Sequence, residues 1–264
     1  MTSVRILSAV LLGGALLAVI LYAPAVWTAV LVVAVVLAGA WEWSAFLRVS
    51  SVAPRLAFVL LSALLLCGGW WLAGRAGGLR DVLVVAGLWW LVALGWILFA
   101  PQRVGRWSAA LAGWLTLVPA GVALLWLSQD PAYGVRWLLF VLLLVWSADT
   151  GAYFAGRAFG RHKLAPRVSP GKTWEGAAGG LLLAGLLAVF AAPVLGKPAF
   201  SFTVLSLLVA AFSIVGDLSE SMFKRHAGLK DSGRLIPGHG GLLDRIDSIT
   251  AAAPLVLLAN GVLS

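Results

Sequence analysis

The chain has 264 residues, of which 62% are hydrophobic and only 11% are charged, and its formal net charge is +9. This composition excludes an ordinary soluble domain, because one core could not bury so many Leu, Val, Ala and Trp side chains. Lipid can solvate them, and each helix in lipid satisfies its own backbone hydrogen bonds. The sequence therefore predicts an all-α fold, a polytopic transmembrane helical bundle.

The basic excess does not indicate a nucleic-acid partner. The Lys and Arg residues lie in short segments between hydrophobic runs, where anionic lipid headgroups and phosphate substrates explain them better. Cys67 is the single cysteine, which excludes a disulfide framework and a cysteine-based metal site. We expect a buried, inert thiol there.

A helix needs about 20 mainly apolar residues to cross the hydrocarbon core of a bilayer. Nine segments meet this requirement: 5–23, 26–47, 54–74, 81–100, 107–127, 134–156, 174–195, 200–218 and 241–263. The first is expected to be a span rather than a signal peptide, because its apolar run is long and further hydrophobic segments follow at once. The last two contain carboxylates, which usually line an interior or an aqueous cavity.

The distribution of basic residues predicts the orientation of these nine spans. With the N-terminus in the cytosol and the C-terminus outside, only four of the 19 Lys and Arg residues lie outside: Arg75, Arg80, Arg136 and Lys197. This asymmetry satisfies the positive-inside rule. We expect a multi-pass protein of the cell inner (plasma) membrane.

The acidic residues divide the chain differently. Only Glu42, Asp81 and Asp130 of the ten acidic residues precede Asp149. We therefore expect residues 1–133 to form an N-terminal scaffold of about five lipid-facing spans. Residues 134–264 are expected to form a catalytic region of about four spans, with cytosolic loops at 157–173 and 219–240.

The first candidate for chemistry is Asp149, which ends an apolar run and begins the sequence Asp-Thr-Gly-Ala-Tyr. An acidic group within a span costs about 2.5–3.5 kcal/mol on insertion scales, so such a group usually has a partner. A structural ion pair with Arg157 or Arg161 is the alternative to a functional role.

The second candidate is the segment from Pro166 to Gly176. Ser169 can cap a helix whose first turn contains Pro170. Free backbone N–H groups and the positive helix dipole would then face a phosphate, and Lys172 would add a charge. The sequence Gly-Lys-Thr at 171–173 is not a P-loop, because Pro166 stands where the first glycine should be.

The third candidate is the region from Gly216 to Asp247. Asp217 with Glu220, and Asp244 with Asp247, are spaced three apart and therefore share a helix face. Carboxylate oxygens beside basic residues suit a magnesium-bound nucleotide, whereas paired surface charges are the alternative. His239 lies between glycines. The alternatives for its role are a metal ligand, a hydrogen-bond donor to phosphate and a residue of the turn.

The stretch from Ser221 to Asp247 reads Ser-Met-Phe-Lys-Arg, then Lys-Asp-Ser-Gly, then Ile-Pro-Gly-His-Gly-Gly-Leu-Leu-Asp-Arg-Ile-Asp. It resembles the signature of the phosphatidate cytidylyltransferases, also called CDP-diacylglycerol synthases. The segments 149–157 and 169–176 are also similar to that family. The resemblance is strong over about 145–250, while the first 140 residues share only repeated spans.

The resemblance implies that CTP and phosphatidic acid are converted to CDP-diacylglycerol and pyrophosphate in phospholipid biosynthesis, with Mg²⁺ required. The phosphatidate oxygen would attack the α-phosphorus of CTP in line, and cations would neutralise the charges. The sequence does not decide whether a second cation binds, or whether that cation is a monovalent ion such as K⁺. A homodimer is compatible with the family, although no residue specifies one.

We assign Asp217 and Asp244 as the principal metal ligands, and Asp247, Glu220 and Asp149 as further ligands or as residues that orient basic side chains. Asp217, Asp244, Asp247 and Lys172 form the expected catalytic set. The residues expected to bind CTP or the lipid headgroup are Asp149, Lys163, Arg167, Ser169, Lys172, Lys224, Arg225, His239 and Arg245.

Two other functions compete with this one. A secondary transporter also has polar residues near broken spans, but the acidic residues here cluster in one half and no inverted repeat is visible. A CTP-dependent lipid or polyprenol kinase, or a cytidylyltransferase for another lipid, is a closer alternative.

Overall fold

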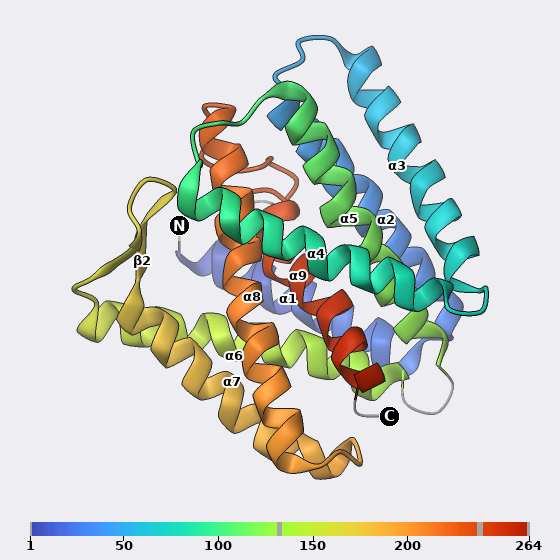
Figure 1. Ribbon diagram of the computed structural model, residues 1–264, viewed down its shortest axis with the longest axis vertical. Coiled ribbons are helices and arrows are strands. Elements are labelled where there is room, and N and C mark those ends of the chain that lie inside the picture. Colours follow the sequence, from blue (N-terminus) through green and yellow to red (C-terminus); the bar gives the residue numbers. More distant parts are fainter. Residues whose placement is uncertain (1, 131–133, 237–239, 263–264) are drawn as a thin grey trace.

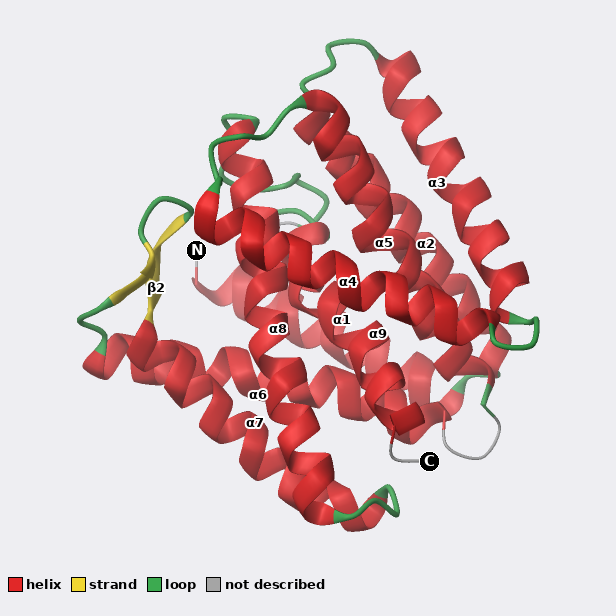
Figure 2. Cartoon of the chain, viewed as in Figure 1, coloured by secondary structure: helices red, strands yellow, loops and turns green. Residues whose placement is uncertain are grey.

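The computed structural model describes residues 2–130, 134–236 and 240–262. Within these ranges the chain forms nine α-helices, one short 3₁₀ helix and a two-stranded hairpin (Figures 1 and 2). The elements in chain order are α1 (Thr2–Tyr22), α2 (Ala25–Trp43), η1 (Ser44–Leu47), α3 (Val52–Ala73), α4 (Gly78–Phe99), α5 (Arg106–Gln129), α6 (Gly134–Phe159), β1 (Lys163–Ala165), β2 (Ser169–Thr173), α7 (Trp174–Val194), α8 (Ala199–His226) and α9 (Leu243–Val262).

Seven helical segments in the described ranges are long and apolar enough to cross a bilayer: Ala25–Leu47 and the helices α3 to α8. In the part of α1 whose side chains the structure describes, Gly13–Tyr22 forms an apolar helical stretch. Helix α9 begins with three charged residues, Asp244, Arg245 and Asp247, among its first five. The chain is thus a polytopic membrane protein, and every segment that we expected to be helical is helical.

Helix α8 extends further than the sequence suggested. We expected it to end near residue 218 and a loop to follow, but it continues to His226 because no helix-breaking residue intervenes. The helix ends at His226, and two residues later Gly228 has a φ of +73°, the left-handed conformation that glycine accepts most readily. The Leu229 N–H then donates to the carbonyl of Lys224 at 2.8 Å. Glu220 and Lys224 are therefore helical residues.

The expected loop 157–173 also contains regular structure. Helix α6 continues to Phe159, and the antiparallel strands β1 and β2 follow, with Lys163 opposite Thr173. The prediction that Ser169 caps a helix is wrong, because Ser169 lies in β2 and Thr173 is the N-cap of α7. The Thr173 hydroxyl accepts a hydrogen bond from the Gly176 N–H at 3.1 Å.

Cys67 is exposed in the described chain rather than buried as expected. It lies on α3, which packs at the edge of the bundle and turns most of its surface outward (Figure 1). In a membrane protein an outward-facing apolar residue is solvated by lipid, so hydrophobicity alone does not indicate that a side chain is buried in protein.

Helices α6 and α7 approach each other through glycines. A Cβ atom on Gly151 would lie 2.4 Å from the carbonyl oxygen of Gly179, and one on Gly180 would lie 2.6 Å from that of Ala148. Small residues at a helix crossing allow this backbone approach, which is characteristic of helix packing in membranes. The crossing holds Asp149 of α6 near the segment that leads into α7.

The N-terminal helices pack against the C-terminal ones. The Trp43 ring of α2 lies 5.1 Å from the Phe223 ring of α8, and its indole N–H donates to the carbonyl of Ala109 in α5 at 2.8 Å. Helices α4 and α5 contact α9, and α4 also contacts α8 (Figure 1). Helices α2, α4 and α5 therefore pack against the helices that carry most of the acidic residues.

The close α6–α7 crossing predicts the effect of one added methyl group. Gly151→Ala should lower the free energy of unfolding by about 1–3 kcal/mol, the usual cost of overpacking. Thermal unfolding in detergent measures this loss. The matched control is Gly95→Ala, because a Cβ at Gly95 has no neighbour within 4 Å. Equal stability of the two variants would contradict the description of the crossing.

Candidate active site

The charged residues of the C-terminal half meet where four segments converge. Helix α6 contributes Asp149, strand β2 contributes Lys172, and α8 and α9 contribute the others. The members, which interact through ion pairs or through their charges, are Asp149, Lys172, Asp217, Glu220, Lys224, Asp244, Arg245 and Asp247. We call this set the charged cluster.

One end of the charged cluster is the ion pair between Lys172 and Asp217. The Lys172 Nζ atom lies 2.5 Å from Asp217 Oδ2, and both side chains are about three-quarters buried. The Ser221 hydroxyl donates to the other oxygen of Asp217 at 3.4 Å. The pair joins the hairpin to α8, although 45 residues separate its members in sequence.

Asp149 interacts electrostatically with Asp217, Lys172 and Arg245. These partners differ from the structural ion pair that we considered as the alternative. The Arg157 guanidinium donates instead to the Tyr153 hydroxyl at 2.9 Å, one helical turn away. Asp149 therefore belongs to the charged cluster.

The other end of the charged cluster is centred on Lys224. Its Nζ atom lies 2.6 Å from Asp244 Oδ1 and 3.4 Å from Glu220 Oε2, and its side chain is 11% exposed. Glu220 is almost fully buried, and neither of its carboxylate oxygens accepts a hydrogen bond from the described residues. The acidic side chain of Asp247 lies close enough to Glu220 for their charges to interact.

Asp244 also organises the segment before α9. Its Oδ2 atom accepts hydrogen bonds from the Ser232 N–H at 3.0 Å and from the Gly241 N–H at 2.9 Å. Gly240 turns the chain here with a φ of +85°, and a Cβ atom on it would lie only 3.0 Å from the same carboxylate oxygen. The carboxylate thus holds Lys224 with one oxygen and the backbone with the other.

The hairpin that carries Lys172 is fixed at its base. Glu175 accepts hydrogen bonds from the backbone N–H groups of Arg161 and His162, at 3.1 and 3.2 Å, and its Oε1 lies 2.7 Å from the His162 ring. These bonds tie the start of α7 to the end of the α6–β1 turn. These hydrogen bonds restrict the positions that Lys172 can occupy.

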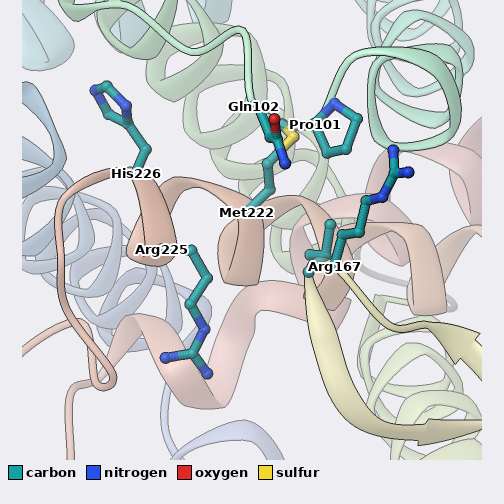
Figure 3. A pocket seen from close by; sticks show the side chains of 7 residues that line it. Pro101, Gln102, Arg167, Met222, Arg225 and His226 are labelled. Atoms are coloured by element: carbon teal, nitrogen blue, oxygen red, sulfur yellow. The ribbon is translucent and has the colours of Figure 1, made fainter.

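The other residues that we expected to bind substrate, where the structure describes them, lie at or near the surface. Lys163 on β1 is exposed, Ser169 on β2 is half-buried, and Arg167 and Arg225 line an open cavity of about 240 Å³. Figure 3 shows the Arg167 and Arg225 side chains pointing in different directions, so they do not converge on one anion-binding centre. His239 lies outside the described residues.

The composition of the charged cluster fits a bound cation. Five acidic side chains face three basic ones, and two of the acids, Glu220 and Asp247, interact with each other in the interior. Hard oxygen ligands of this kind suit Mg²⁺. However, no three His, Cys, Asp or Glu side chains in the described ranges are grouped as a complete metal site, so Asp217, Asp244 and Glu220 do not form one by themselves.

The sequence-based assignment missed Glu42. This residue belongs to α2, yet its buried carboxylate accepts three hydrogen bonds from the segment around Ser232 and the start of α9. The signal that could have revealed it is an acidic residue near the end of an otherwise apolar span, since such residues usually have a function or a partner.

Fold and site together define a polytopic membrane protein with a charged site inside its helical bundle. Residues 3–262 match the Cytidylyltransferase family, and the chain belongs to that family. It is 43% identical to a phosphatidate cytidylyltransferase of Haemophilus influenzae over 95% of each chain. It is 46% identical to a phosphatidate cytidylyltransferase of Pseudomonas aeruginosa, over 84% of this chain and 83% of that protein.

The burial of Lys224 predicts its contribution to stability. Lys224→Met should lower the free energy of unfolding by about 3–5 kcal/mol, because it leaves two buried carboxylates without their cation. Lys230→Met is the control, since Lys230 is exposed. The thermal unfolding midpoints of the two purified variants would be compared in detergent, and the account of this ion pair is wrong if they coincide.

Proposed function

We propose that the chain is a phosphatidate cytidylyltransferase, which makes CDP-diacylglycerol and pyrophosphate from CTP and phosphatidate. Its relatives of that name match along nearly its whole length. The observation that carries the proposal is the charged cluster, which places lysines and an excess of carboxylates at the convergence of four segments. Such a site can hold a nucleotide triphosphate together with its cation.

The reaction needs no nucleophile from the protein. A phosphate oxygen of phosphatidate forms a bond to the α-phosphorus of CTP, and the bond from that phosphorus to the oxygen bridging to the β-phosphate breaks. Pyrophosphate leaves with the bonding electrons. Catalysis then consists of positioning the two substrates and neutralising the charge on the attacking and leaving oxygens.

We assign Asp217 and Asp244 as the residues that would hold Mg²⁺, with Glu220 beside them and Asp149 and Asp247 orienting the basic side chains. Mg²⁺ usually takes only one or two protein carboxylates and completes its shell with water and substrate phosphates, so a complete site need not exist before CTP binds. When bound, the ion supplies charge neutralisation at the phosphates. A second cation, K⁺ among the candidates, would be identified by metal analysis of the purified protein.

We assign the lysines of the charged cluster to phosphate binding. Lys172 and Lys224 already neutralise carboxylates and can shift toward a phosphate oxygen, and we assign Arg245 to the same role. Lys163, Arg167, Ser169 and Arg225 lie nearer the surface, where we propose that they attract the triphosphate and the lipid headgroup.

We propose nine spans with a cytosolic N-terminus, an external C-terminus and an active site that faces the cytosol of the cell inner membrane. This orientation puts the α4–α5 connection, the hairpin and the end of α8 on the same side. In support, Gln102, Arg167 and His226, one from each of these segments, line one cavity. Residues 1–133 act as scaffold and residues 134–264 carry the reaction.

The proposed reaction predicts which product the purified protein forms. Purified protein with Mg²⁺, α-labelled CTP and a panel of lipid acceptors should form labelled CDP-diacylglycerol only with phosphatidate. Asp217→Asn and Asp244→Asn should each lower this activity by more than about 100-fold, since even outer-shell partners of a metal contribute about 10- to 100-fold. Asp81→Asn, an exposed residue of α4, is the control.

Two results would contradict this prediction. Transfer of label to another lipid, or γ-phosphate transfer, would replace the proposed reaction by a related one. Full activity in the folded Asp217→Asn and Asp244→Asn proteins would remove these residues from the site.

The position of Lys172 predicts a kinetic effect. Lys172→Ala should lower kcat/KM about 10- to 100-fold while the fold is retained, because a hydrogen bond to a charged group contributes about 1.5–3 kcal/mol. Lys197→Ala, on the connection between α7 and α8, is the control. Initial rates at varied CTP and phosphatidate measure the effect, and unchanged kinetics for both substrates would place Lys172 outside the site.

The proposed orientation predicts which residues are labelled from outside the cell. In a Cys67→Ser background, the single substitutions Ala23→Cys and Arg75→Cys should react with a membrane-impermeant maleimide in intact spheroplasts. Arg161→Cys should react only after permeabilisation. Labelling of the Arg161→Cys protein from outside, or protection of the Ala23→Cys protein, would refute the nine-span orientation.

A further inference from the structure

We propose that Glu42 is a positioning residue for cytidylyl transfer. It acts on the site through the segment before α9, of which the structure describes residues 231–236 and 240–242, and through Leu243 at the start of α9. The effect of Glu42 on the reaction rests on the proposed function. Glu42 lies near the end of α2, in the half of the chain that we otherwise describe as scaffold. Its effect would therefore make the N-terminal half part of the active centre.

The Glu42 carboxylate is anchored to three neutral donors. It is 3% exposed, and it accepts hydrogen bonds from the Ser232 hydroxyl at 2.9 Å, the Leu242 N–H at 3.0 Å and the Leu243 N–H at 2.8 Å. A buried carboxylate is costly unless it is hydrogen-bonded. Leu243 begins α9, where free N–H groups and the positive end of the helix dipole favour an anion.

Ser232 connects Glu42 to Asp244. The Ser232 hydroxyl donates to Glu42 and accepts a hydrogen bond from the Asp244 N–H at 3.3 Å. The Ser232 N–H donates to the Asp244 carboxylate at 3.0 Å. Two carboxylates from opposite ends of the chain thus hold the same serine, and a shift of Ser232 would displace Asp244.

The segment encloses the Glu42 carboxylate closely. A Cβ atom on Gly233 would lie 2.2 Å from Glu42 Oε1, and one on Gly241 would lie 2.5 Å from Glu42 Oε2. Only glycine allows this approach at both positions. The fit indicates that the carboxylate of α2 sets the positions of Ser232, Gly233 and Gly241. The regular structure in the described part of the segment is one isolated bridge between Ile236 and Gly240.

A double-mutant cycle tests the connection. Glu42→Gln keeps the size of the side chain but puts an amide NH₂ against N–H donors, so kcat should fall about 10- to 100-fold, as for other outer-shell residues. The KM for CTP should change less. If Glu42 acts in part through Ser232, the double variant should lose less kcat than the product of the two single losses, because coupled residues are not additive.

A second measurement needs no substrate. Trypsin should cut the Glu42→Gln protein after Lys230 and Arg234 faster than it cuts the unmodified chain. Ser62→Ala is the control, because this buried hydroxyl donates only within its own helix, to the Phe58 carbonyl. It should change neither cleavage nor kcat.

Unchanged kcat and unchanged cleavage in the Glu42→Gln protein would overturn the proposal. Multiplicative effects of Glu42→Gln and Ser232→Ala would also overturn it, since they would show that Glu42 does not act through Ser232. If the unmodified protein makes no CDP-diacylglycerol, the proposed function fails, whereas the trypsin comparison still decides whether Glu42 fixes the segment.

Discussion

The structure depends on the neutralisation of carboxylates inside a bundle of membrane-length helices. An isolated charge there is unfavourable, so each acidic residue needs a cation or several donors. Lys172 meets Asp217, and Lys224 lies between Asp244 and Glu220. These two lysines come from a hairpin and from a helix, and their partners come from α8 and α9. Neutralising the charges therefore fixes how the last helices and the hairpin sit together.

The sequence was sufficient for the parts of the fold that depend on local composition. All nine helical segments were predicted, because about 20 apolar residues in a row have few alternatives. The hairpin, the extension of α8 to His226 and the Thr173 cap were not. The hairpin depends on hydrogen bonds between residues 13 and 14 apart, such as those that the Arg161 and His162 N–H groups donate to Glu175. Periodicity and composition do not contain this information.

The same limit applies to the candidate site. The sequence spacing predicted that Asp217 lies near Glu220 and that Asp244 lies near Asp247. The structure adds the lysines: Lys172 pairs with Asp217, and Lys224 pairs with Glu220 and Asp244. It also brings in Glu42, 190 residues from Ser232 in sequence, which no local pattern connects to the signature. The scaffold helices and the signature residues thus form one unit, with an excess of acidic groups where the substrate phosphates would bind.

This excess of acidic groups leads to the most direct test of the account. Five carboxylates against three basic side chains should repel a triphosphate unless a divalent cation binds with it. Isothermal titration of the purified protein with CTP, in Mg²⁺ and then in EDTA, measures this dependence without turnover. The account predicts binding in Mg²⁺ and its loss in EDTA. Equal affinity in both conditions would contradict a cation-dependent nucleotide site in the charged cluster.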